Sequence, residues 1–178
     1  MMIMRNLIQA TGIAVALFFL LGFGPARPEV PDPLKAPANE DVILEGHATG
    51  VQIYTCQAGT DHYAWVLKAP EAELTDETGK NIVQHFAGPS WKHVDGSVVT
   101  GKLVAKQDAP KPDAIPWLLV SAASHTGEGV MARVTTIQRI HTEGGLPPKA
   151  ADCTVSASGQ ESRSAYSADY YFYAPSQK

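Results

Sequence analysis

The chain contains no cluster of basic residues along its 178 positions. Its 14 lysines and arginines are outnumbered by 18 aspartates and glutamates, and both signs are scattered through the sequence. Proteins that bind nucleic acid concentrate positive charge against the phosphate backbone. Nucleic acid is therefore not expected among its partners.

The sequence also lacks the short motifs that usually carry catalysis or metal binding. It has no G-x-S-x-G nucleophile frame and no glycine-rich phosphate loop. The closest two histidines, His85 and His93, are eight positions apart, whereas zinc ligands commonly recur two to four residues apart on one element. We expect neither a metal nor a cofactor, and the sequence selects no catalytic residue.

Apolar residues at helical spacing are scarce after the first 26 residues, with one short possible helix at 69–76. Instead, short runs rich in Val, Ile, Tyr and Thr alternate with glycine, proline or acidic turns. Residues 42–48 form the first run, and Gly50 starts the second. Such spacing predicts an all-β domain over residues 42–178, either an antiparallel sandwich or a partly closed barrel.

The first 26 residues have the order of a secretory signal peptide: Arg5, an apolar run over 7–23, then small residues at Gly24 and Ala26. The run is short for a spanning helix. Residues 27–41 form a proline-rich stretch, predicted to be an extended leader. We expect a secreted or periplasmic protein without integral membrane association after cleavage. The cleaved protein keeps 13 of the 14 basic residues and all 18 acidic residues, so its net charge is −5.

Only two cysteines are present, Cys56 and Cys153. In an oxidising compartment an isolated pair most often forms a disulfide. The chain-entropy model gives such a long loop a stabilisation of roughly 4–5 kcal/mol at most.

The stretch HFAGPSWKHVDGSVVTGK, residues 85–102, gathers histidines, a tryptophan and an aspartate. Asp95-Gly96 between two extended runs is a strong signal for a two-residue hairpin turn, because both central positions of that turn need positive φ. This interpretation pairs Val94 with Ser97 and gives Asp95 a role in the turn rather than in chemistry.

The final run, SAYSADYYFYA, alternates in a way that predicts its two faces. Tyr166, Ala168, Tyr170 and Phe172 form the expected core face. Tyr171 and Tyr173 lie on the other and are candidates for lining a groove that stacks against a ligand, although half-exposed strands often carry tyrosine for packing alone.

Arg139 and His141 share one face of a predicted strand with polar residues on both sides. They form the best candidate pair for an anionic ligand, and the competing interpretation is surface salt bridging. His85 is a further candidate ligand-binding residue.

Several phrases resemble one family when taken in order: GVQIYTC, HFAGPSWKHVDGSVVTGK, AIPWLLVSAASHTGEGV, VTTIQRIHTEGGLPPKAADC and YSADYYFY. The chain resembles the DUF3455 family, exported proteins of bacteria and fungi with no assigned function. The resemblance implies a single exported domain and transfers no site residues.

The sequence favours a non-catalytic module that binds a small molecule, a glycan or an envelope component. Two alternatives remain. One is a secreted hydrolase with residues converging from loops, for which His85, Asp95 and His141 are the first candidates. The other is a structural or stress-related envelope protein; the oligomeric state stays open.

Overall fold

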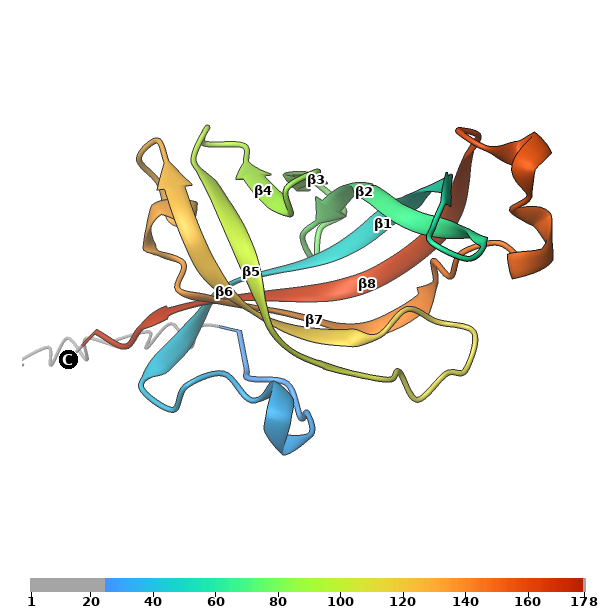
Figure 1. The fold of residues 1–178 in the computed structure, drawn as a ribbon. Helices are drawn as coiled ribbons and strands as arrows, with labels where there is room; N and C mark the ends of the chain where they lie inside the picture. Colours follow the sequence, from blue (N-terminus) through green and yellow to red (C-terminus); the bar gives the residue numbers. More distant parts are fainter. Residues whose placement is uncertain (1–24, 178) are drawn as a thin grey trace, which may run out of the picture.

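The computed structural model describes residues 25–177. The predicted signal peptide therefore lies almost entirely outside the described residues. Within them, eight antiparallel strands follow one another around a single sheet, and the last strand pairs with the first to close it (Figure 1). The predicted all-β fold is confirmed, in its barrel form. Between residues 25 and 177, no helix has the length and apolarity needed to cross a membrane.

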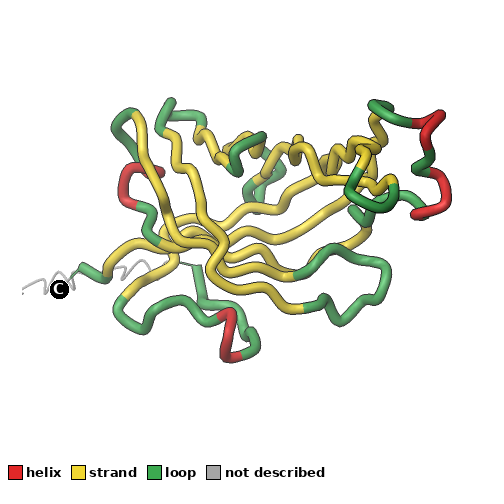
Figure 2. Tube along the Cα trace, in the orientation of Figure 1, coloured by secondary structure: helices red, strands yellow, loops and turns green. Residues whose placement is uncertain are grey.

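Turns and loops join the strands, and the β6–β7 and β7–β8 connections contain 3-10 turns (Figure 2). The strands are β1 (Glu40–Ala58), β2 (Tyr63–Thr75), β3 (Asn81–Phe86), β4 (Ser90–His93), β5 (Val98–Gln107), β6 (Trp117–Thr126), β7 (Thr136–Gly144) and β8 (Glu161–Pro175). The 3-10 turns are η1 (Asp32–Leu34), η2 (Val130–Arg133), η3 (Ala150–Asp152) and η4 (Val155–Ala157).

Strand β1 is continuous where the sequence predicted two runs separated at Gly50. This glycine does not break the strand, since it pairs with Ala72 on one side and Tyr166 on the other. A Cβ at this position would lie 2.2 Å from the Glu71 carbonyl oxygen and 2.5 Å from Cα of Ala72. Glycine is thus required by the close approach of β2, and not by a turn.

The predicted short helix at 69–76 was wrong, because these residues lie almost entirely in β2. Ala72 and Leu74 are buried, while Glu71 and Glu73 point outward. That alternation is the two-residue period of a strand. Pairing with β1 on one side and β3 on the other outweighs the helical propensity of the segment.

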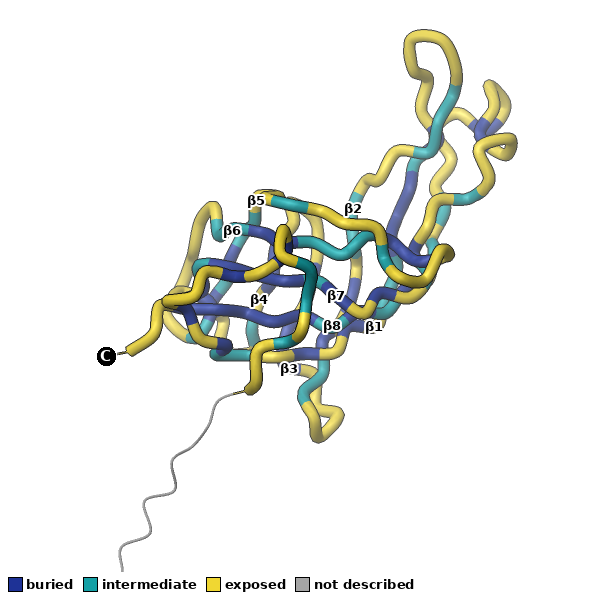
Figure 3. The backbone as a smooth tube through the Cα atoms, turned by 90° about the horizontal axis from the view of Figure 1, so that it is seen from below, coloured by how far each residue is buried: buried dark blue, intermediate teal, exposed yellow. Residues whose placement is uncertain are grey.

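The barrel interior holds the main apolar core. Its predicted face on β8 is confirmed, because Tyr166, Ala168, Tyr170 and Phe172 are all buried. Near one end, η2 contributes buried Met131 to the same cluster. Buried positions follow β7 and β8 through the barrel, whereas the end loops are exposed (Figure 3).

The leader packs against the outer surface of the barrel. Leu34 in η1 is fully buried, and its carbonyl accepts a hydrogen bond of 2.6 Å from Gln138 Nε2 on β7. The Arg27 guanidinium lies 5.3 Å from the centre of the Tyr173 ring. The leader thereby covers outward-facing side chains of β7 and β8.

Cys56 and Cys153 form the predicted disulfide, with their Cα atoms 5.4 Å apart. It joins the end of β1 to the segment that carries η3 and η4. Ala157 is buried beside the bridge, and Trp65 packs against it. Hydrogen bonds between Cys56 and residues 159 and 160 hold this segment to β1 together with the covalent link.

Candidate functional site

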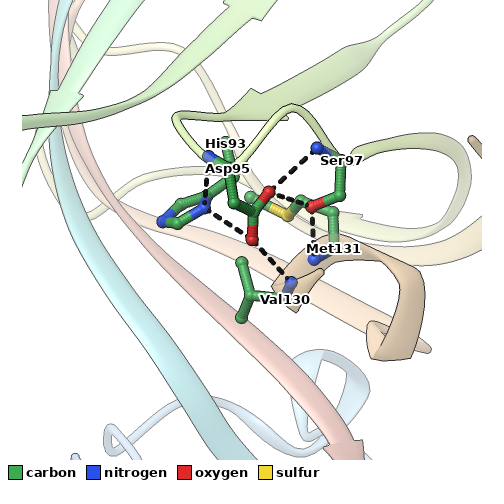
Figure 4. A network of polar contacts seen from close by, with 5 residues as sticks. All are labelled: His93, Asp95, Ser97, Val130 and Met131. Atoms are coloured by element: carbon green, nitrogen blue, oxygen red, sulfur yellow. Dashed lines mark hydrogen bonds and ion pairs between the residues drawn. The ribbon is translucent and has the colours of Figure 1, made fainter. Parts of the chain in front are cut away.

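The Asp95 turn is a structural unit (Figure 4). Asp95 Oδ1 accepts hydrogen bonds from the Ser97 amide at 2.9 Å and its hydroxyl at 2.5 Å, and Oδ2 accepts one from the Val130 amide at 2.9 Å. The Ser97 hydroxyl and the Val130 amide hold the pKa of Asp95 well below its usual range. The carboxylate thus ties the hairpin to η2.

The predicted register of this hairpin was wrong by one residue. Ser90 pairs with Thr100 and Trp91 with Val99, and the turn closes with the His93 amide donating to the Ser97 carbonyl at 3.0 Å. The loop therefore has three residues and ends with Gly96 at a φ of 92°. A type I turn followed by a left-handed glycine gives this arrangement. It turns Trp91 toward the barrel interior together with Val99.

The interior contains a cavity of about 250 Å³ that opens through the side of the barrel. The opening exists because β3 and β4 are short: β3 pairs with β2 only from Ala72 onward, and β4 pairs with β5 only up to Thr100. The cavity is lined from β1 to β8 and by the β3–β4 turn. Its lining comprises Gln52, Leu67, Lys68, Ala69, Pro70, His85, Gly88, Pro89, Trp91, Leu103, Leu118, Val120, Ile137, Arg139 and Tyr170.

Arg139 is the main charged group of this cavity. Its Nη2 donates to the Pro116 carbonyl at 2.8 Å, whereas its Nε–H is buried without a partner. No carboxylate among residues 25–177 lies within 4.0 Å of the guanidinium. Arg139 is half-buried, so its charge loses part of its hydration without gaining a counter-charge, which is unfavourable. This residue is consequently the strongest sign of a missing anionic partner.

Two further nitrogen donors line the cavity without partners. Gln52 and Trp91 are each only 2% exposed, and Gln52 Nε2 and Trp91 Nε1 make no hydrogen bond. Five buried side-chain polar atoms of the described chain lack a partner, and three of them belong to Gln52, Trp91 and Arg139. Native proteins leave few such groups unpaired, so this concentration in one cavity needs an explanation.

His85 forms part of the cavity wall in its neutral state. Burial lowers its pKa to about 4. The Ser90 carbonyl, 2.9 Å from Nδ1, can only accept, so Nδ1 carries the hydrogen and Nε2 presents a lone pair. The ring stacks on Trp91 at 4.5 Å. His85 therefore offers a flat surface and an acceptor, but no positive charge near neutral pH.

Larger hollows of about 470 to 650 Å³ lie on the outside of the barrel. None of the residues that line these hollows carries one of the unpartnered atoms. Their size reflects open surface, and the smaller interior cavity has the features of a binding site.

His141 lies on the opposite side of the barrel wall from Arg139. The register of β7 against β8 shifts between Ile140 and Glu143, and His141 has a φ of 48°. This irregularity reverses the alternation, so His141 points outward and its Nδ1 lies 2.8 Å from Asp169. His47 contacts the other oxygen of Asp169 at 2.7 Å. Arg139 and His141 do not form a common site.

Tyr171 and Tyr173 face outward, as their alternation predicted, but the leader covers them. Both belong to an outer cluster with Ala36 and Val42, and the Tyr173 hydroxyl donates to Gln138 Oε1 at 2.5 Å. They line no cavity with Arg139. Their described contacts stabilise the attachment of the leader.

The first hydrolase candidates are not assembled into a site. His85 lies inside the barrel, Asp95 at the β4–β5 turn and His141 on the outer wall; no hydrogen bond or ion pair within the described chain joins any two of them. Over residues 25–177, no cluster of three or more His, Cys, Asp or Glu side chains is placed to hold a metal ion.

The family model described as "Protein of unknown function (DUF3455)" matches residues 37–174, most of the chain. The chain belongs to the DUF3455 family. No curated protein and no solved structure matches this DUF3455 chain. The match covers the barrel except for the last residue of β8 and includes both cysteines, so the cavity lies within the family domain.

Sequence reasoning missed Gln52, Trp91 and Leu103 as site residues of this DUF3455 barrel, since Trp91 was assigned only to the hairpin. A usable signal existed for Gln52. It lies four residues before Cys56 on the same strand, so both side chains face the same side of the sheet, and a disulfide residue is expected to be buried. Leu103 gave no such signal, since its role depends on the short β4 strand that leaves it at the cavity opening.

Proposed function

We propose that this DUF3455 protein is an exported, non-catalytic module that binds a small molecule inside the barrel. The observation that carries the proposal is the interior cavity with unpartnered donors on Gln52, Trp91 and Arg139. Small-molecule sites are typically concave and apolar, with a few placed polar groups. Leu118, Val120 and Ile137 supply the apolar wall.

Export is part of the proposal. The Cys56–Cys153 disulfide supports it, because such bonds persist in oxidising compartments and are rare in the cytosol. Residues 1–26 lead to the same expectation, because their basic residue, apolar run and small residues follow the order of a signal peptide. The protein accordingly meets its ligand in the periplasm or outside the cell.

A ligand enters through the side opening between β2 and β5. Leu67 and Leu103 flank it, and each is 52% exposed. Apolar side chains left in water at the rim of a cavity favour contact with an apolar ligand.

The test compares two neighbouring substitutions on β5. Leu103→Trp places bulk at the opening, whereas Val104→Trp adds the same bulk at a position that is 59% exposed and outside the cavity lining. Saturation-transfer NMR and calorimetry with phenylacetate, 2-phenylethanol and indole report binding. We expect millimolar or tighter binding of at least one compound, weakened about tenfold or more by Leu103→Trp and retained by Val104→Trp.

Two results would contradict the proposal. One is the absence of binding by all three compounds at millimolar concentration. The other is equal weakening by both substitutions, since that outcome places binding on the outer surface. Melting temperatures of both variants show whether each protein is folded before the titration.

A further inference from the structure

The cavity combines one half-buried cation, whose Nε–H is fully buried, with a small and mainly apolar volume. We propose that its ligand is a small monocarboxylate, anchored by Arg139 and by the side-chain N–H groups of Gln52 and Trp91. The inference rests on the proposed function and specifies its ligand class.

The unpaired state of Arg139 is the first argument. The guanidinium lies close enough to buried tyrosines that its charge partly opposes the rise in the pKa of Tyr170, which burial causes. The same charge adds to the lowering of the pKa of His85, whose main cause is also burial. All these neighbours are neutral near pH 7 and leave the positive charge without a counter-ion. A carboxylate supplies one.

The geometry of the donors favours an oxygen acceptor. Arg139 Nε–H, Gln52 Nε2–H and Trp91 Nε1–H are donors that make no hydrogen bond within the described chain. A guanidinium is a planar fork that matches the two oxygens of a carboxylate, and charge-assisted bonds of this kind are stronger than neutral ones. The remaining lone pairs of the carboxylate can accept from Gln52 and Trp91.

The count of charges favours a monoanion over a phosphate group. Lys68 is the other cation in the lining, and it already forms an ion pair with Glu161. Neutral His85 presents a lone pair at Nε2, which repels additional negative charge. A dianionic phosphate would leave one of its charges without compensation.

The volume limits the body of the ligand. A cavity of about 250 Å³ lies below the roughly 300–1,000 Å³ usual for drug-sized ligands. Leu118, Val120 and Ile137 offer apolar contact on one side, and the stacked rings of His85 and Trp91 offer a flat surface on the other. A single ring or a short alkyl chain fits these walls.

Three probes of nearly equal shape test the inference: phenylacetate, 2-phenylethanol and benzylphosphonate. They share the ring and the one-carbon spacer and differ in the charge of the head group. Calorimetry should show that the wild-type protein binds phenylacetate about tenfold or more tighter than 2-phenylethanol, and tighter than benzylphosphonate.

The decisive variant is Arg139→Met, which keeps an apolar stem and removes the charge. It should abolish the preference for phenylacetate and still bind 2-phenylethanol, and that residual binding shows that the cavity is intact. If this variant fails to fold, Arg139→Lys replaces it, because a compact ammonium keeps the charge but loses the fork; it should retain a reduced preference. Lys68→Met removes the other cation of the lining and tests whether it contributes; because Lys68 is already paired with Glu161, this variant should keep the preference for phenylacetate.

Each alternative outcome has a distinct meaning. Equal wild-type affinity for phenylacetate and 2-phenylethanol, with both blocked by Leu103→Trp, overturns the carboxylate inference and leaves the binding function intact. Tighter binding of benzylphosphonate also overturns it. If Lys68→Met loses the preference for phenylacetate and Arg139→Met retains that preference, Arg139 is not the anchor of the carboxylate. Failure of all probes contradicts the proposed function itself.

Discussion

Acid should destabilise this protein through one buried histidine. Burial lowers the pKa of His85 from 6.5 to about 4 in the folded state. Between those pH values the unfolded chain binds the proton more readily, so the contribution of His85 to stability is complete above about pH 6.5 and declines as the pH falls toward 4. Linkage gives a loss of about 2.5 kcal/mol in unfolding free energy between about pH 8 and pH 4.5.

The measurement compares wild type with His85→Phe by urea unfolding at both pH values, with the disulfide intact. Phenylalanine keeps a flat ring against Trp91 and loses the hydrogen bond to Ser90, which costs about 1 kcal/mol at either pH. The variant should lose about 2.5 kcal/mol less than wild type on acidification. Carboxylate buffers are avoided, because the proposed ligand is a carboxylate. Equal acid losses in the two proteins would refute the neutral, buried state of His85.

Three further predictions concern the fold. Gly96→Val should lower the unfolding free energy by about 1 kcal/mol or more in urea titrations, because Gly96 has a φ of 92° that a β-branched residue resists; an unchanged value argues against the three-residue loop. Gly50→Ala should cost about 2 kcal/mol or more, since its Cβ would meet the backbone of β2; wild-type stability would mean that β1 is interrupted there. Replacing Cys56 and Cys153 by serine should lower the unfolding free energy by up to about 4–5 kcal/mol, because the bridge closes a loop with a sequence separation of 97. The intact mass of the wild-type protein without reductant should be two hydrogens below that of the reduced protein, and a free thiol in that sample would contradict the bridge.

Alternation along a strand predicted the fold well where pairing is regular. The four inward residues of β8, from Tyr166 to Phe172, were identified because β8 pairs with β1 over this range without a register shift. The same rule failed at His141, where an irregularity in β7 reverses the direction of the side chain. A local backbone distortion of this kind leaves no apolar pattern in the sequence.

The hairpin shows a second limit. Asp95-Gly96 correctly marked a turn, but the dipeptide fits both a two-residue and a three-residue loop. The hydrogen bond that the Val130 amide donates to the Asp95 carboxylate helps to fix the longer loop, and it comes from a segment 35 residues away. Register therefore depended on a tertiary contact that local sequence does not encode.

The candidate site could be predicted only in part. Arg139 and His85 were identified as candidates from their chemistry, and the structure places both in one cavity. Gln52, Trp91 and Leu103 join them from separate strands, so their proximity results from barrel closure. The unpaired atoms that single out the cavity are a property of three-dimensional packing.

The most direct test of the central claim follows nitrogen-bound protons by ¹⁵N NMR while phenylacetate is added. The Arg139 Nε–H, Gln52 side-chain amide and Trp91 indole signals should shift together and saturate at one affinity. The indole of Trp65, which packs beside the disulfide, should remain unchanged. Saturable shifts confined to Trp65 and other residues outside the cavity, with the three interior signals unmoved, would contradict the account.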